Sequence, residues 1–153
     1  DMAVAELADT QARTEGSRRA VSLKERRLKY EFEMDGLRIV FPATAGAIRR
    51  EGKVLDHCVG GYASRHMSGV CTILFLRRAD DPHTPYITIE MDGNKIRQIH
   101  GYHNDTLAGS PKPREVHKDF LAAWLRWLRA GSQRNEDGTP KLPKRTKKQK
   151  EVA

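Results

Sequence analysis

Two histidines, a cysteine and a tyrosine in this sequence are of types that transfer protons or act as nucleophiles near neutral pH. The stretch KVLDHCVGGYASRH, residues 53–66, places His57 beside Cys58 and Tyr62 just after two glycines, and His100 follows later in the chain. A histidine that takes the proton of Cys58 would create a reactive thiolate. His100 is the better candidate for this base, because neighbouring side chains on a helix diverge. The alternative interpretation is that Cys58 is a small buried side chain.

The same histidines suit a second chemistry, the metal-independent cleavage of a phosphodiester. In that reaction paired acid and base groups act on an RNA 2′-hydroxyl, and histidine fits because its pKa lies near neutrality. Tyr62 and Glu90 are further candidates for this site. Glu90 and Arg97 are expected on the sheet face opposite His100, so a cross-strand ion pair is the predicted role for them.

Metal and cofactor chemistry find no matching motif. The chain has six histidines and two cysteines, but no CxxC, HxxxH or HExxH spacing, so no metal site is expected. It also lacks GxxxxGK[ST], GxGxxG and GxSxG patterns, and no cofactor is expected. Cys58 and Cys71 are too few for a disulfide framework and are interpreted as reduced thiols.

Helical spacing predicts the element that carries the first motif. A short helix is expected over residues 45–51 with Thr44 as its N-cap and Gly52 as its C-cap, followed by a second helix from residue 53. The inward positions of the second helix are Leu55, Cys58, Val59, Tyr62 and His66. Gly60 and Gly61 each cost about 1 kcal/mol in a helix interior, so they indicate a close backbone approach or a break.

Alternating patterns predict strands around this helix. Residues 34–42, MDGLRIVFP, read as a short strand after an Asp-Gly turn, and residues 70–78, VCTILFLRR, read as a central strand. A hairpin is expected at about residues 85–100. One face of it would carry Ile87, Ile89, Met91, Ile96, Gln98 and His100, and the other Tyr86, Thr88, Glu90, Arg97 and Ile99. We therefore expect Gln98 and His100 to meet His57, Cys58 and Tyr62 in one pocket or polar cluster between helix and sheet.

Together these elements predict an α+β fold. A small antiparallel sheet of three to four strands is expected to pack against two or three helices, flanked by basic flexible ends. Residues 1–35 would form a basic N-terminal helical arm or linker, residues 36–130 the domain, and residues 131–153 a disordered basic tail. An amphipathic helix ending at Gly131 should bury Trp124 and Trp127 as core residues, not as a base-stacking platform.

Charge favours a nucleic-acid partner, either DNA or RNA. The chain has 28 Lys and Arg against 20 Asp and Glu, a net charge of +8 and a pI of about 9.7. The predicted phosphate contacts are Arg26, Arg27, Lys144, Arg145, Lys147 and Lys148. No apolar run approaches the roughly 18 residues that span a bilayer, so no membrane partner is expected and the predicted location is cytoplasmic. The oligomeric state is left open.

The motifs resemble the PcfJ-like family of conjugative plasmids, phages and related mobile elements. The family pattern has a histidine–cysteine–valine–glycine–glycine–tyrosine core, which is found here at residues 57–62 with Gly60 and Gly61 as its glycines. A Pro-aromatic strand ending in glutamate is similar to residues 85–90, and a glutamine-containing strand before a glycine and an asparagine is similar to Gln98, Gly101 and Asn104. The resemblance covers about residues 36–130 and implies a mobile-element context, with Gly60, Gly61, Glu90, Gln98 and Asn104 as motif residues.

The leading functional hypothesis is a nucleic-acid-binding accessory protein of a mobile element or phage, with a possible histidine-based processing site formed by His57, Cys58, Tyr62 and His100. One alternative is a Cys58-dependent transferase or hydrolase. Another is a non-catalytic protein–protein adaptor. A purely structural polar network that fixes the helix to the sheet would use the same residues.

Overall fold

The computed structural model describes residues 22–106 and 112–144, and it has an α+β fold built on one antiparallel sheet. The five strands pair in chain order: β1 (Phe32–Met34), β2 (Leu37–Val40), β3 (Thr72–Arg78), β4 (Ile87–Asp92) and β5 (Lys95–His100). The helices are α2 (Ala45–Leu55), α3 (Ala63–Ser68), α4 (Pro113–Val116) and α5 (Lys118–Arg129), preceded by a helix over residues 22–30. Two 3₁₀ turns, η1 (Cys58–Tyr62) and η2 (Tyr102–Asp105), complete the described elements. The predicted fold class is confirmed, with one strand more than expected.

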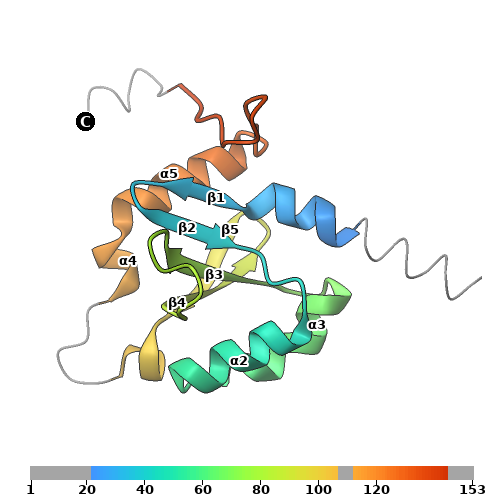
Figure 1. Cartoon of the computed structure of the whole chain (residues 1–153), viewed down its shortest axis with the longest axis vertical. Coiled ribbons are helices and arrows are strands. Elements are labelled where there is room, and N and C mark those ends of the chain that lie inside the picture. The colour runs from blue at the N-terminus through green and yellow to red at the C-terminus, as the bar shows by residue number, and fades with distance from the viewer. Residues whose placement is uncertain (1–21, 107–111, 145–153) are drawn as a thin grey trace, which may run out of the picture.

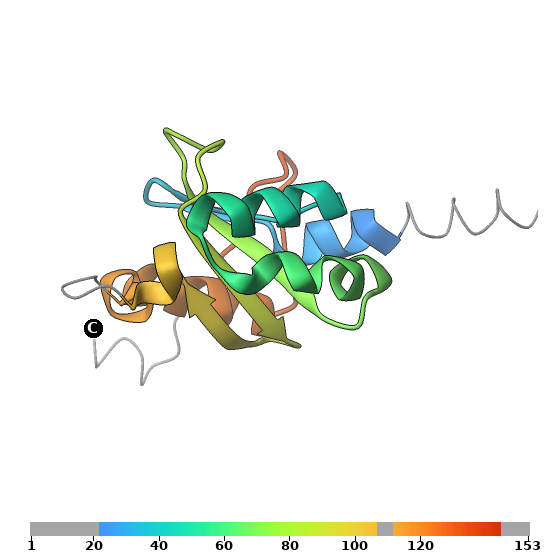
Figure 2. The same cartoon turned by 90° about the horizontal axis from the view of Figure 1, so that it is seen from below.

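Helices cover both faces of the sheet (Figures 1 and 2). Helix α5 lies against one face, where Trp124 and Trp127 are fully buried among the apolar side chains of the strands. The prediction that these tryptophans are core residues is confirmed. Helix α2, η1 and α3 cover the other face, where Ile48 and Val59 pack against Ile73 and other β3 side chains. Strand β3 therefore sends alternate side chains to the two helical layers, with Leu74 and Leu76 on the α5 side and Ile73 and Phe75 on the other.

The N-terminal part of the described chain belongs to the same core. Tyr30 and Phe32 are buried with the α5 face of the sheet. Strand β1 pairs with β2 through a turn in which Asp35 and Gly36 have positive φ values of 51° and 78°. The domain start expected at residue 36 falls inside this hairpin, so the packed unit extends at least to the helix over residues 22–30.

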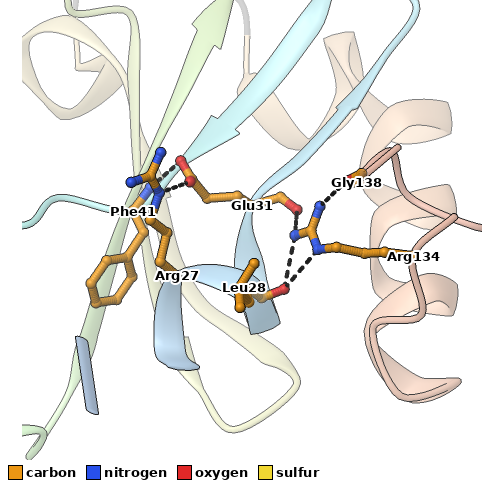
Figure 3. Close-up of polar contacts among 6 residues, drawn as sticks. All are labelled: Arg27, Leu28, Glu31, Phe41, Arg134 and Gly138. Atoms are coloured by element: carbon orange, nitrogen blue, oxygen red, sulfur yellow. Dashed lines mark hydrogen bonds and ion pairs between the residues drawn. The ribbon is translucent and has the colours of Figure 1, made fainter. Parts of the chain in front are cut away.

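Residues 131–144 also pack on this unit, where the sequence pattern predicts a disordered tail. The Arg134 guanidinium donates hydrogen bonds to the carbonyl oxygens of Leu28 at 2.8 Å, Glu31 at 2.6 Å and Gly138 at 3.0 Å (Figure 3). The Glu31 carboxylate in turn contacts Arg27 and accepts from the backbone N–H of Phe41. Residues 131–144 are thus held against the helix over residues 22–30, and residues 145–153 lie outside the described part of the chain.

The motif segment is not the continuous helix expected from residue 53. Thr44 caps α2 as predicted, because its hydroxyl accepts from the Ala47 N–H at 3.1 Å. However, α2 runs through Gly52 to Leu55 and ends where Asp56 adopts a left-handed conformation with φ 51°. A Cβ at Gly52 would lie 2.9 Å from the Gly60 nitrogen, so a glycine is needed where η1 folds back on α2.

The hairpin contains a bulge that changes the predicted facing of its side chains. Glu90 pairs with Gln98, but Met91 pairs with Ile96, so Arg97 is the extra residue. As a result Gln98 and His100 share a face with Glu90 and not with Met91. The prediction that Glu90 and His100 lie on opposite faces of the sheet is wrong.

Two buried polar contacts fix the α2–η1–α3 layer to the sheet. Glu51 on α2 and Arg77 on β3 form a bidentate ion pair, with both N–O distances 2.6 Å. The His66 ring is fully buried, accepts from the Ile73 N–H at its Nδ1, and contacts the Pro42 carbonyl through Nε2, both at 2.9 Å. No helix among residues 22–106 and 112–144 has the length and apolar character needed to cross a bilayer.

Candidate functional site

A pocket of about 320 Å³ lies between η1 and the adjacent face of the sheet, and we call it the histidine pocket. Its walls come from η1 with the residue before it, from β3, β4 and β5, and from the η2 turn: His57, Cys58, Val59, Tyr62, Ile73, Thr88, Glu90, Gln98, His100, Asn104 and Thr106. The pocket contains all five of the side chains predicted to converge. It also contains two more of the motif residues, Glu90 and Asn104.

His57 is held at both ring nitrogens. Its Nδ1 accepts from the backbone N–H of Val59 at 3.4 Å, and its Nε2 lies 3.0 Å from the Thr88 hydroxyl. Because Nδ1 is an acceptor, the proton of the neutral ring is on Nε2 and is donated to Thr88. Burial lowers the pKa of His57, and the proximity of His100 acts in the same direction. At neutral pH the pocket therefore holds a neutral imidazole with its N–H directed across the site.

His100 has a different environment, set by a carboxylate on one side. Its Nδ1 is 3.6 Å from Oδ2 of Asp105, and Asp105 accepts hydrogen bonds from the Gly101 N–H at 3.0 and 3.1 Å. A Cβ at Gly101 would lie 2.9 Å from Asp105 Oδ1, so only glycine allows this approach. The carboxylate lies on the Nδ1 side of the imidazole, so Nε2 is the ring nitrogen that is not beside it.

The η2 turn that supplies Asp105 has an unusual backbone. His103, Asn104 and Asp105 are three consecutive residues with positive φ, at 54°, 55° and 62°. Asn and Asp tolerate this region better than most residues, although each still costs free energy relative to an extended or helical conformation. The turn brings Asn104 into the histidine pocket and Asp105 beneath His100.

The two cysteines differ in surroundings. Cys58 is exposed and lines the histidine pocket. Cys71 is partly buried, and burial raises the pKa of its thiol. Beside Cys58, the ring of Tyr62 carries the Arg65 guanidinium at 4.2 Å from its centroid, which gives this edge of the pocket an aromatic–cationic pair.

Glu90 is the acidic group of the pocket wall. Its side chain is 8% exposed and lies 3.6 Å from the mostly exposed Arg97 guanidinium, which confirms the predicted ion pair. The bulge at Arg97 allows this pairing while Gln98 lies directly opposite Glu90.

The predicted phosphate-contacting residues are dispersed. The Arg26 guanidinium bonds to the carbonyl oxygens of His66 and Cys71 and lies over the Phe41 ring, so it is used inside the fold and does not fit the predicted role. Arg27 is exposed but pairs with Glu31. Lys144 is exposed. Arg145, Lys147 and Lys148 lie outside the described residues.

The residues that line the pocket lie within a stretch that matches a family model. The model of the family described as "PcfJ-like protein" matches residues 2–112 of this chain. The chain belongs to the PcfJ-like family. A protein of Listeria innocua, named "Uncharacterized protein Lin1253/Lin1744", is 33% identical over 92 residues, which are 54% of this chain and 20% of that protein. The chain thus spans about a fifth of the length of this relative. No solved structure matches the chain.

The residues on which the sequence resemblance was based lie at two places in this fold. Most of them line the histidine pocket, but Pro85, Tyr86 and Gly101 line a separate cavity of about 590 Å³ beside α4. There the Tyr86 hydroxyl lies 2.6 Å from Nε2 of His117, and burial lowers the pKa of His117. Tyr86 therefore connects β4 to the α4–α5 segment and is a structural member of the motif.

Sequence patterns missed several residues of the PcfJ-like pocket. Without the bulge, the alternation of the hairpin places Thr88 on the sheet face away from His100, and nothing else in the sequence marks Thr88 as a pocket residue. Asp105 stands next to the motif residue Asn104, but nothing in a loop sequence indicates three left-handed residues in succession. Thr106 gave no signal. Among the described residues, no three or more His, Cys, Asp or Glu side chains form a group that could hold a metal ion.

The geometry of this PcfJ-like pocket supports proton transfer combined with hydrogen bonding. One imidazole is neutral with a defined donor nitrogen, and the other lies beside a carboxylate. Two histidines in unlike surroundings within one pocket can play different roles on the same bound group. Cys58 adds an accessible sulfur to the same wall.

Proposed function

We propose that this PcfJ-like protein binds nucleic acid and acts on a phosphodiester of the bound strand in the histidine pocket. The observation that carries the proposal is the presence of His57 and His100 in one pocket, with Asp105 beside the Nδ1 of His100 and the Nε2 of His57 donating to Thr88. Two positioned imidazoles supply what metal-independent cleavage of RNA requires.

The roles follow from the surroundings of the two rings. His100 takes the proton of a ribose 2′-hydroxyl through Nε2, since Asp105 occupies the Nδ1 side. The 2′-oxygen then bonds to phosphorus, the bond from phosphorus to the 5′-oxygen breaks, and the released 5′-oxygen takes a proton from water. The hydroxide formed from that water takes the proton held by His100, which restores the neutral ring. His57 donates from Nε2 to a non-bridging phosphoryl oxygen in place of Thr88, which stabilises the charge that develops there.

Binding affinity has two sources in this proposal. The net charge of +8 provides phosphate attraction that is independent of sequence and falls with salt. At the pocket edge, the Tyr62 ring with its stacked Arg65 offers a face for a base, and the polar atoms of Gln98 and Asn104 offer hydrogen bonds.

Fluorescence anisotropy and a cleavage assay test the proposal together. Labelled RNA and DNA strands of about 12 nucleotides are titrated at salt concentrations from about 50 to 200 mM. Affinity should fall steeply with salt, and RNA should be cut in the presence of EDTA. The H100Q variant should bind RNA as the native protein does but lose about 100-fold or more in cleavage rate, which is typical of a lost acid–base group.

The variant H83Q is the matched control, because His83 is exposed in the β3–β4 loop and outside the pocket. Its cleavage rate should equal that of the native protein. Absence of any salt-dependent binding near 50 mM salt would refute nucleic-acid binding. Binding without EDTA-resistant cleavage would refute the reaction and leave a binding protein.

A second candidate function is thiol chemistry at Cys58, a transferase or hydrolase activity. It is favoured by one observation, that Cys58 is exposed on the wall of the pocket that contains His100, whereas Cys71 is partly buried. Iodoacetamide labelling followed by mass spectrometry separates the two cysteines. If C58S retains full cleavage of RNA while H100Q does not, the thiol has no part in the reaction.

The cellular setting follows from the sequence resemblance. We propose that the protein is an accessory factor of a mobile genetic element, such as a conjugative plasmid or a phage, and acts in the cytoplasm. Recovery of the element's nucleic acid after cross-linking and precipitation of the tagged protein tests this setting. Recovery of proteins only, without nucleic acid, would instead favour the adaptor hypothesis.

A further inference from the structure

A second, basic pocket of about 260 Å³ lies next to the histidine pocket, and we call it the anion pocket. Its walls come from α2 and η1: Arg49, Gly52, Lys53, His57, Cys58, Gly60 and Gly61. His57 and Cys58 belong to both pockets, so the two cavities share a wall. No carboxylate lines the anion pocket.

The positive charge of this pocket is uncompensated within the described residues. Arg49 and Lys53 are exposed, lie four residues apart on one side of α2, and make no ion pair with any residue in the ranges 22–106 and 112–144. The neighbouring acids are engaged elsewhere. Glu51 is buried with Arg77, and the Asp56 carboxylate lies 3.1 Å from Nδ1 of His103.

The glycines leave the floor of the pocket open to a ligand. A Cβ at Gly61 would meet nothing within 4 Å, so the space beside this backbone is empty of protein atoms. An anion can therefore approach the chain at Gly61, while Arg49 and Lys53 contact it from α2. Guanidinium and ammonium groups that face an exposed backbone are the chemistry that binds a phosphoryl group.

We propose that the anion pocket binds a phosphate group of the strand whose neighbouring phosphodiester enters the histidine pocket. The identity of the phosphate carrier rests on the proposed function, whereas the recognition of phosphate rests on the charges and space described here. The shared wall places the bound phosphate beside His57, so this pocket fixes the register of the strand relative to His57 and His100.

Two double variants of equal charge test the proposal. R49Q/K53Q removes both cations of the anion pocket. K118Q/R129Q removes two exposed cations from α5, which lies on the opposite face of the sheet (Figure 2). Both sets are exposed side chains, so both variants should fold as the native chain does.

Inorganic phosphate and pyrophosphate are titrated into ¹⁵N-labelled protein and followed by NMR. The Gly60 and Gly61 amide signals should shift with either anion. R49Q/K53Q should bind pyrophosphate about tenfold more weakly or worse, because hydrogen bonds to charged groups are lost. K118Q/R129Q should bind it as the native protein does. Equal affinities for the two variants, or unshifted glycine amides, would overturn the proposal.

Binding to single-stranded RNA gives a separate readout. In R49Q/K53Q the slope of log affinity against log salt should decrease by about 1.4, the value for two lost phosphate contacts on a single strand. If phosphate shifts the glycine signals but no RNA binds, the anion pocket stands and the proposed function fails. If RNA binds with the same slope in both variants, the proposed function stands and the anion pocket does not contact the strand.

Discussion

Replacing His66 by glutamine should remove a pH-dependent part of the stability of this fold. The His66 side chain is 0% exposed, and burial lowers its pKa from 6.5 to about 4. In its neutral form the ring accepts from the Ile73 N–H and donates to the Pro42 carbonyl. Protonation of Nδ1 would break the first of these bonds and leave a buried charge, which is why the folded state resists it.

The sign and size follow from proton linkage. Between pH 6.5 and about pH 4 the unfolded chain binds a proton at His66 that the folded chain does not. The stabilisation is therefore complete above pH 6.5 and is lost as the pH falls towards 4. The difference between the two pKa values corresponds to about 3 kcal/mol of unfolding free energy.

Urea unfolding of the native protein and of H66Q between about pH 7.5 and pH 4 measures this difference, because most other titrating groups contribute equally to both proteins. At neutral pH the native protein should be more stable by about 1–3 kcal/mol, since the Ile73 N–H loses its acceptor in the variant. That advantage should shrink by about 3 kcal/mol towards pH 4. H83Q, altered at an exposed histidine, should follow the native curve. Parallel curves for the native protein and H66Q would refute the reasoning.

Two further predictions concern the contacts that hold the pocket walls. R77M leaves the Glu51 carboxylate buried without a partner and should cost about 3–5 kcal/mol of unfolding free energy, while E51M/R77M should recover most of it in the same urea assay. Additive losses in the double variant would contradict a paired role. G101A places a methyl group 2.9 Å from Asp105 Oδ1, so it should lower stability by about 1–3 kcal/mol and shift the His100 ring signals in NMR spectra. Unchanged His100 signals would show that Asp105 does not orient this ring.

Much of the sheet could be predicted from the sequence because its signals are local. The Asp92–Gly93 turn marks the hairpin predicted at about residues 85–100, the Asp35–Gly36 turn marks the start of the strand predicted at residues 34–42, and the apolar run before residue 78 marks the central strand. The pairing of β1 with β2 was not predicted. Thr44 was predicted as a helix cap for the same reason, since its hydroxyl bonds only three residues away. The two tryptophans of α5 followed from helical spacing. Each of these features depends on neighbours in the chain and not on distant contacts.

The bulge at Arg97 shows where local patterns fail. The sequence of β5 alternates as in a regular strand, so it does not reveal the extra residue. In the structure this residue places Gln98 and His100 on the sheet face opposite to the predicted one. Gln98 and His100 line one pocket with His57, Cys58 and Tyr62, as predicted. However, they share their sheet face with Thr88 and Glu90, and not with Met91. Ile87, Ile89 and Met91 lie on the other face of the sheet, where they pack against α5.

The break between α2 and η1 was also beyond the sequence pattern. Leucine, valine and tyrosine recur at helical spacing across residues 55–62, so one helix was the simplest prediction. The chain instead turns at Asp56 and packs η1 against Gly52 of the preceding helix. This turn moves Cys58 to an exposed position at the pocket, where a continuous helix would have buried it.

The left-handed turn at residues 103–105 bears on whether the polar cluster is only structural. Three successive residues with positive φ cost of order 1 kcal/mol or more each, and such conformations persist only where the rest of the structure imposes them. The turn buries little apolar surface, since Asn104 is exposed and His103 is only half-buried. What it achieves is to place Asn104 on the wall of the histidine pocket and the Asp105 carboxylate beside His100. The Glu51–Arg77 pair and the buried His66 already connect the α2–η1–α3 layer to the sheet, so the strained turn agrees with the proposed binding of a strand in the histidine pocket.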